Sequence, residues 1–236
     1  MVYQWLNSFI STWLPQSCVL CGLSSHRQAL CPDCLQDLPR LSPDLCPRCG
    51  LPAGLSNAQD CGHCLQLQPA YHRVYSAFGY APPVSQLVAR LKFRGQIQLA
   101  RLFGELLAQR LAEHTIQADA LLPVPLHPNR LRQRGFNQAL EIARPLAQAF
   151  GLPLLTGGVH RQRDTEPQST RAASQRGHNL RDAFRLVQLP AYERIAIVDD
   201  VMTSGHTANE LAKLLREAGV KEIEVWCVAR ALPHPH

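Results

Sequence analysis

The chain has 236 residues, of which 46% are hydrophobic and 18% are charged, with a formal net charge of +6. This composition excludes a wholly disordered chain, a coiled coil and a collagen-like chain, and the length suits one large domain or one domain plus a small one. No run of about 18 apolar residues lacks charge or proline, and no basic residue precedes Arg27. We therefore expect no membrane span, no export signal and a cytoplasmic protein.

The first element that we expect is a short amphipathic helix over residues 1–14. Trp5, Phe9 and Trp13 recur at a spacing of four, and Pro15 ends the pattern. Because no basic residues flank this apolar stripe, it predicts packing against a core rather than contact with a membrane.

Eight of the nine cysteines lie close together, in four C-x-x-C pairs: Cys18/Cys21, Cys31/Cys34, Cys46/Cys49 and Cys61/Cys64. Disulfides are a poor explanation in a reducing compartment, whereas two such pairs supply the four thiolates of a closed tetrahedral zinc site. We predict a double zinc ribbon with two structural Zn²⁺ ions, within a domain over residues 1–68. Joining neighbouring pairs closes the shorter loops and is favoured, but a cross-brace of alternate pairs stays open.

A second domain is expected over residues 69–236, where strand and helix patterns alternate. Strands are expected over 73–80, 120–124, 154–159 (weakly), 194–198 and 223–228, and helices over 84–95, 99–111, 138–150 and 207–218. Near-continuous apolar strands that alternate with helices predict an α/β fold, with a parallel sheet covered by helices.

Basic residues are concentrated in residues 127–185, which contain ten Arg, no Lys and four acidic residues and therefore account for the whole excess of +6. Guanidinium groups suit phosphate oxygens, so this segment indicates an anionic partner such as a phosphate, a diphosphate or a nucleic-acid backbone. A merely solvated basic surface is the alternative. The arginines assigned to anion or DNA contacts are Arg130, Arg132, Arg134, Arg161, Arg163 and Arg176.

The sharpest motif is the run IAIVDDVMTSGHT over residues 195–207, in which a buried strand leads into two acids and a loop that opens a helix. Loop amides and a helix N-terminus form an anion site, and Gly205 lets the backbone approach a phosphate closely. Asp199 and Asp200 can accept hydrogen bonds from the vicinal hydroxyls of a sugar. The motif is neither a P-loop nor G-x-G-x-x-G. An acidic strand end followed by an ordinary capped helix is the alternative.

This run resembles the phosphoribosyl diphosphate (PRPP) signature of type I phosphoribosyltransferases. With the cysteine pairs and the runs over 91–95, 123–138 and 161–184, the chain is similar to the ComF family of competence and DNA-utilisation proteins over roughly residues 15–232. The resemblance implies a type I phosphoribosyltransferase-like domain preceded by a zinc ribbon. It also implies a role in DNA uptake, natural transformation or the use of extracellular DNA.

The resemblance further implies that PRPP arrives with Mg²⁺ and that Asp199 and Asp200 are the catalytic acids on its ribose. Lys92 joins the arginines as an anion or DNA contact. The implied PRPP-binding residues lie in a 5′-phosphate loop and in a diphosphate loop: Met202, Thr203, Ser204, Gly205, His206 and Thr207 in the first, and Val124, Pro125, Leu126 and His127 in the second.

Three functions stay open. The chain is a phosphoribosyltransferase (a glycosyltransferase of the pentosyl class) with an unknown acceptor, a non-catalytic protein that binds PRPP or single-stranded DNA, or an adaptor whose ribbons dock a partner such as a DNA-translocation helicase. Many phosphoribosyltransferases build a base-recognising site after the last strand, and we expect no such pocket here. No general base is obvious either, since His127 and His206 are read as hydrogen-bonding or exposed side chains.

Overall fold

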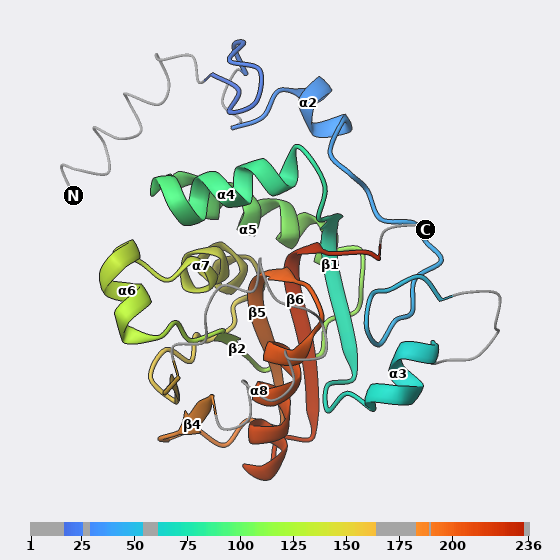
Figure 1. Ribbon diagram of the computed structural model, residues 1–236, viewed down its shortest axis with the longest axis vertical. Helices are drawn as coiled ribbons and strands as arrows, with labels where there is room; N and C mark the ends of the chain where they lie inside the picture. The colour runs from blue at the N-terminus through green and yellow to red at the C-terminus, as the bar shows by residue number, and fades with distance from the viewer. Residues whose placement is uncertain (1–16, 26–28, 54–60, 164–182, 189, 234–236) are drawn as a thin grey trace.

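The computed structural model describes residues 17–25, 29–53, 61–163, 183–188 and 190–233 (Figure 1). The helix expected over residues 1–14 lies outside the described residues, as does Arg176. The elements in chain order are α2 (Pro32–Gln36), α3 (Gly62–Leu67), β1 (Arg73–Gly79), α4 (Val84–Arg94), α5 (Gln98–Leu111), β2 (Ala120–Pro123), α6 (Pro128–Arg134), α7 (Gln138–Phe150), β3 (Val159–Arg161), β4 (Phe184–Leu186), β5 (Arg194–Met202), α8 (His206–Glu217) and β6 (Glu222–Arg230).

The centre of the molecule is a four-stranded sheet in the order β1-β6-β5-β2, with every pair parallel. The two inner strands, β5 and β6, have nine residues each and are nearly continuous in apolar side chains. Strands of this kind are buried on both faces, because the crossover helices of a parallel sheet pack on both sides. The predicted α/β fold is confirmed.

Each face of the sheet has its own helix layer. On one face, Trp226 and Val228 of β6 belong to a core cluster with residues of α4, α5 and α7. On the other face, Val225 and Cys227 of the same strand cluster with residues of α8. Helices α5 and α7 approach closely at Gly104, where an added Cβ would lie 2.4 Å from the Pro145 side chain. This two-layer cover leaves the carboxyl ends of the strands as the place where loops can form a site.

The structure differs from the expected elements at three places. Strand β5 continues beyond the expected end at Val198 to Met202, because β6 pairs with it along this whole length. Helix α6 was not expected, since its residues are polar and none is buried. The weak strand expected over 154–159 is a single bridge from Leu154 to Leu121, followed by a small antiparallel pair of β3 with β4.

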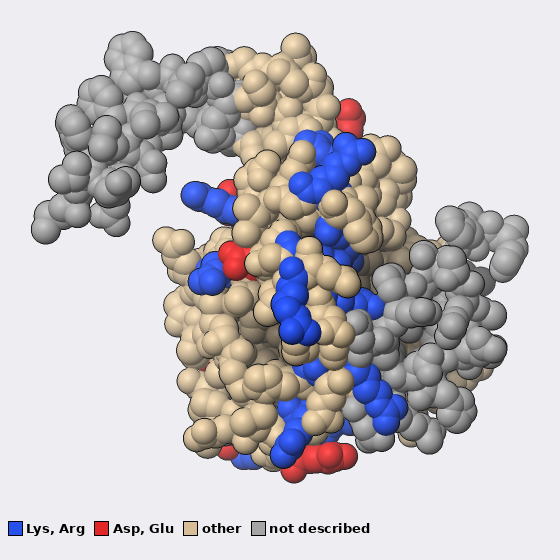
Figure 2. Space-filling view, turned by 60° about the vertical axis from the view of Figure 1, so that its left-hand side comes forward, with Lys and Arg blue, Asp and Glu red and all other residues tan. Residues whose placement is uncertain are grey.

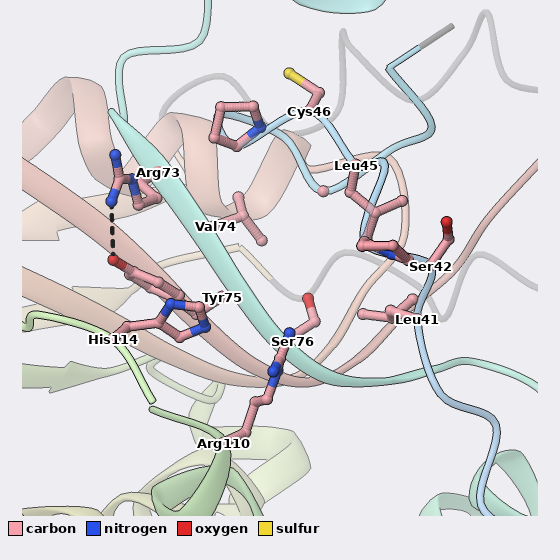
Figure 3. Close-up of a pocket in the computed structure, with 13 residues that line it drawn as sticks. Leu41, Ser42, Leu45, Cys46, Arg73, Val74, Tyr75, Ser76, Arg110 and His114 are labelled. Carbon is pink, nitrogen blue, oxygen red and sulfur yellow. Dashed lines mark hydrogen bonds between the residues drawn. The ribbon is translucent and has the colours of Figure 1, made fainter. Parts of the chain in front are cut away.

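The chain between the two cysteine-rich segments runs along the outer edge of β1. The Gly79 amide donates to the Pro39 carbonyl at 2.8 Å, and the Val74 amide donates to the Pro47 carbonyl at 3.0 Å. Between these contacts a pocket of about 280 Å³ opens beside β1, with Arg73, Tyr75 and further side chains around it (Figure 3). Apart from Cys46, none of the site residues predicted from the sequence lines this pocket.

Within the described residues, every helix is too short or too polar to cross a bilayer.

Candidate anion site and metal centres

The cysteine pairs form two separate four-sulfur groups. In each group all four Sγ atoms lie within 4.8 Å of one another. The Sγ atoms are 3.8 Å apart for Cys46 and Cys64 and 3.4 Å apart for Cys49 and Cys61. Tetrahedral Zn–S bonds of about 2.3 Å place sulfur atoms about 3.8 Å apart, so both groups fit zinc. We call Cys18, Cys21, Cys31 and Cys34 the first ribbon, and Cys46, Cys49, Cys61 and Cys64 the second ribbon.

This grouping joins neighbouring pairs along the chain, as the sequence favoured, and not alternate pairs. Four thiolates close a zinc site and leave no position for a substrate, so these centres are structural.

The turn between β5 and α8 is built around one glycine. Gly205 has φ +79°, and a Cβ at this position would lie 2.8 Å from Met202 Cε and 3.0 Å from the Tyr71 hydroxyl. The positive φ favours glycine, and any Cβ at this position would displace the end of the Met202 side chain. Helix α8 begins at the next residue, and its first amides, with the positive end of the helix dipole, face the turn. Ser204 Oγ and His206 Nδ1 lie 2.7 Å apart within it. This arrangement can hold a phosphate group.

The two acids before this turn have different surroundings. Asp200 is buried, and its Oδ2 lies 2.7 Å from Nζ of Lys92 on α4. Burial lowers the pKa of Lys92, but the Asp200 carboxylate more than reverses this, so the net effect raises it. Lys92, predicted to contact an anionic ligand or DNA, is thus an ion-pair partner of the second acid.

Asp199 is half-buried and lies beside Cys227 in the register of β5 and β6. Burial and the neighbouring Asp200 charge raise the pKa of Asp199 to about 7. Of the two residues, Asp199 is the more exposed, whereas Asp200 is buried and paired with Lys92.

The predicted diphosphate loop, Val124–His127, follows β2 at the same edge of the sheet. The Asn137 side chain donates to the Val124 carbonyl at 3.0 Å and accepts from the Ala139 amide at 3.0 Å. Asn137 thereby fixes the loop and begins α7. His127 begins α6, since its Nδ1 accepts from the Asn129 amide at 3.2 Å. Pro125 and Leu126 lie between these two anchors and are half-buried.

Helix α6 carries three of the predicted anion contacts. Arg134 donates to Gln138 at 2.5 Å, and Arg132 donates to Asn129 at 2.5 Å. Burial lowers the pKa of Arg134, the Asp200 carboxylate acts in the opposite direction, and the Arg130 charge adds to the lowering.

Figure 2 shows the molecule turned so that the side of Figure 1 with α6 comes forward. Basic side chains form a nearly continuous row over this face, with few acids among them. Arg161, on β3, lies over the Phe184 ring with 5.6 Å between Cζ and the ring centroid, and Arg163 is exposed just after it.

Comparison with known proteins gives two family models: a double zinc ribbon domain matches residues 9–65, and a phosphoribosyl transferase domain matches residues 137–233. Competence protein F of Haemophilus influenzae is 37% identical over 225 residues, which cover 91% of this chain and 96% of that protein. DNA utilization protein YhgH of Escherichia coli K12 is also 37% identical, over 93% of this chain and 99% of that protein. Competence protein ComFC of Streptococcus pneumoniae is 27% identical, over 90% and 99%.

This chain belongs to the ComF family.

Among solved structures, glutamine PRPP amidotransferase of B. subtilis matches with 25% identity and a TM-score of 0.36, over 53% of the ComF chain and 25% of its own.

Sequence reasoning overlooked three residues of this ComF-family site. Arg230 ends strand β6 and is only 1% exposed, yet its side chain contacts the turn after β5. Nothing in the spacing of the sequence pointed to it, although an arginine directly after the apolar run Val225–Ala229 was a signal that could have been followed. Tyr71 and Asn137 were likewise given no role.

Proposed function

We propose that this ComF-family protein binds PRPP with Mg²⁺ in the turn between β5 and α8 and acts in the cytoplasm in competence or in the use of extracellular DNA. The names of the relatives, competence protein F and DNA utilization protein YhgH, support the biological part of this proposal. The observation that carries the molecular part is the turn itself, in which two acids, a glycine that admits no side chain and a helix N-terminus occur together.

Each part of the turn has a task in this proposal. The amides at the start of α8 and the hydroxyls of Thr203, Ser204 and Thr207 would hold the 5′-phosphate. Asp199 would accept hydrogen bonds from the ribose hydroxyls, while the ion pair with Lys92 holds Asp200 in place. The loop after β2, with Arg134 beside it, would hold the diphosphate.

The two acids before the turn and the phosphates of the substrate together suit Mg²⁺, which binds through one or two carboxylates and keeps several waters. When bound, the ion neutralises charge on the diphosphate. If transfer occurs, the bond between the anomeric carbon and the diphosphate oxygen breaks, and the acceptor forms a new bond to that carbon. The guanidinium groups near the diphosphate loop would stabilise the leaving group.

The test is calorimetric titration of PRPP with Mg²⁺ into the native protein and into Asp199→Asn/Asp200→Asn. We expect micromolar affinity in the native protein and loss of binding in the double variant. Glu210→Gln is the matched control. Glu210 pairs with Lys213 on the same helix, so the substitution removes one negative charge outside the turn. A folded native protein that does not bind PRPP would contradict the proposal.

A second candidate function is direct binding of single-stranded DNA, and the row of basic side chains in Figure 2 favours it. Arg130, Arg132 and Arg134 on α6 would follow the backbone phosphates. The triple substitution of these residues by Ala should weaken binding of an oligonucleotide, measured by fluorescence anisotropy. It should also flatten the salt dependence, by about 0.7 in the slope of log K against log salt for each lost phosphate contact.

The control is Arg101→Ala/Arg110→Ala, which removes two exposed arginines of α5 that pair with their own helix neighbours. Equal weakening by both sets would indicate a nonspecific charge effect.

A further inference from the structure

Arg230 connects the second ribbon to the turn between β5 and α8. Its Nε donates to the Cys49 carbonyl at 2.8 Å. Its Nη1 donates to the Met202 carbonyl at 2.9 Å and also to the Thr203 carbonyl. One buried side chain therefore bonds a zinc knuckle on one side and the candidate phosphate loop on the other.

The charge of Arg230 needs a partner, because a buried unpaired cation is strongly unfavourable. Among the described residues, no Asp or Glu forms an ion pair with it. Four thiolates around one divalent zinc carry a net charge of −2, and the Arg230 guanidinium bonds the backbone of one of those cysteines. The metal-bound second ribbon is thus the counter-charge that fits this site.

The bonds from Arg230 also set the direction of the loop amides. In a trans peptide the N–H of one residue points opposite to the C=O of the residue before it. The peptide bonds of the loop are trans. Because the Met202 and Thr203 carbonyls point to Arg230, the Thr203 and Ser204 amides point away from it. Arg230 therefore directs these donors outward, where an anion can meet them.

The segment that leaves the second ribbon fixes the same region from another direction. The Ala70 amide donates to Asn209 Oδ1 on α8 at 2.8 Å, and the Arg216 side chain of α8 donates to the Ala70 carbonyl at 3.1 Å. The Tyr71 hydroxyl fills the space beside Gly205. Helix α3, which contains Cys64, is drawn next to the lower end of β1 in Figure 1. The hydrogen bonds of Ala70 therefore join the chain that leaves the second ribbon to α8.

We propose that the second ribbon is part of the phosphate site, with Arg230 as its positioning residue. Metal binding fixes the Cys49 knuckle, and Arg230 passes this constraint to the loop that presents its amides to PRPP. Loss of the second zinc then weakens PRPP binding, and loss of the first does not. This inference rests on the proposed binding of PRPP at that turn.

The first test measures PRPP affinity in variants of the full-length protein. Cys64→Ser and Arg230→Lys should each weaken binding by about tenfold or more, within the usual range of coupling between sites. The matched controls are Cys21→Ser in the first ribbon and Arg90→Lys, whose parent side chain bonds the Val19 carbonyl of the first ribbon at 2.7 Å. Unchanged affinity in Cys64→Ser and Arg230→Lys, with the folded state verified by circular dichroism, would overturn the proposal.

The second test uses reciprocity, because a metal that strengthens PRPP binding must itself be bound more tightly when PRPP is present. In Cys21→Ser, where the second zinc is the one retained, saturating PRPP should raise zinc affinity against a chelator by the factor seen in the first test. In Cys64→Ser, the remaining zinc should not respond. Equal responses of both zinc ions, or none, would contradict the coupling.

A readout without PRPP separates this inference from the proposed function. Amide hydrogen exchange at residues 203–207 should speed up when the second zinc is removed and not when the first is removed. If the native protein does not bind PRPP but the exchange follows the second zinc, the proposed ligand is wrong and the coupling stands. If exchange ignores the second zinc, the coupling is wrong whatever the ligand.

Discussion

The two ribbons use the same C-x-x-C knuckles but differ in what surrounds them. In the first ribbon Cys21 is exposed and Cys34 is half-buried, but Cys18 and Cys31 belong to the core cluster that includes residues of α4 and α5, and Arg90 on α4 bonds the Val19 carbonyl. In the second ribbon all four cysteines are buried, and Arg48, Arg230 and the Val74 amide bond it to the rest of the chain.

This difference teaches that one sequence motif can serve two purposes within a chain. The first ribbon joins the sheet domain through apolar packing around Cys18 and Cys31, whereas the four buried sulfurs of the second ribbon form a cluster of their own that hydrogen bonds join to the rest of the chain. The predictions below test how far this distinction holds.

The largest expected effect is on stability. Cys64→Ser should lower the free energy of unfolding of the sheet domain by on the order of 5 kcal/mol, because loss of a buried metal is among the most damaging single changes. Cys21→Ser should cost less, because Cys21 is exposed and its side chain is not part of the core cluster that includes Cys18 and Cys31. The fluorescence of Trp226, which is fully buried in β6, reports the transition in a Trp5→Phe/Trp13→Phe background. Equal losses in both variants would remove the distinction between the ribbons.

The two linking arginines provide the next comparison. Arg230→Met should cost about 4 kcal/mol, since it removes charged donors from buried carbonyls on both sides. Arg90→Met should cost about 1 kcal/mol, because its side chain is only half-buried and bonds one ribbon carbonyl. Urea unfolding of both variants measures the difference. A cost for Arg90→Met as large as that for Arg230→Met would show that the first ribbon is equally integrated.

Helix α4 could couple the first ribbon to the candidate site, because it carries both Arg90, which bonds that ribbon, and Lys92, which pairs with Asp200. Lys92→Met should cost about 3 kcal/mol by leaving the Asp200 carboxylate buried and unpaired. Adding Asp200→Asn to Lys92→Met should recover most of this loss, as urea unfolding of the single and double variants can show. If removal of the first zinc changes the free energy of unfolding of the native protein but not that of Lys92→Met, the first ribbon is coupled to the Lys92–Asp200 ion pair through α4.

The most gradual expected effect is a pH dependence from Asp199, which is spread over about three pH units. Its pKa is raised to about 7 in the folded protein, so the folded state holds a proton that the unfolded state has released. This contribution to stability falls as the pH rises from about 4 to about 7, by at most about 1.4 kcal/mol per pH unit. Metal thiolates give the opposite trend, so the measurement is the difference between the native protein and Asp199→Asn. Parallel curves for the two proteins would contradict the raised pKa.

Much of the fold could be predicted from local patterns. The apolar runs over 194–198 and 223–228 predict β5 and β6, and the spacing of the cysteines predicts the two metal groups. Helix α6 could not be found this way, because it buries no side chain and has no apolar stripe. Its start depends on His127 and Pro128, which read equally well as a turn.

Part of the candidate site could likewise be predicted from a local motif, and part of it could not. The acids and Gly205 lie within one continuous motif, so sequence alone brings them together. The Lys92–Asp200 ion pair and the Arg230 bonds join residues that are far apart in the chain. Such contacts depend on the packing of α4 against the sheet and of the second ribbon against β6, which no local pattern records.

Strand β1 forms one edge of the sheet, and the segment from Pro39 to Pro47, which runs into the second ribbon, covers it with the carbonyls of these two prolines. An uncovered edge strand is a template on which another chain can pair. That segment is held at its far end by Cys46 of the second ribbon. Metal-free protein should therefore self-associate through β1 at high concentration, so chelators during purification should produce aggregates and zinc should prevent them.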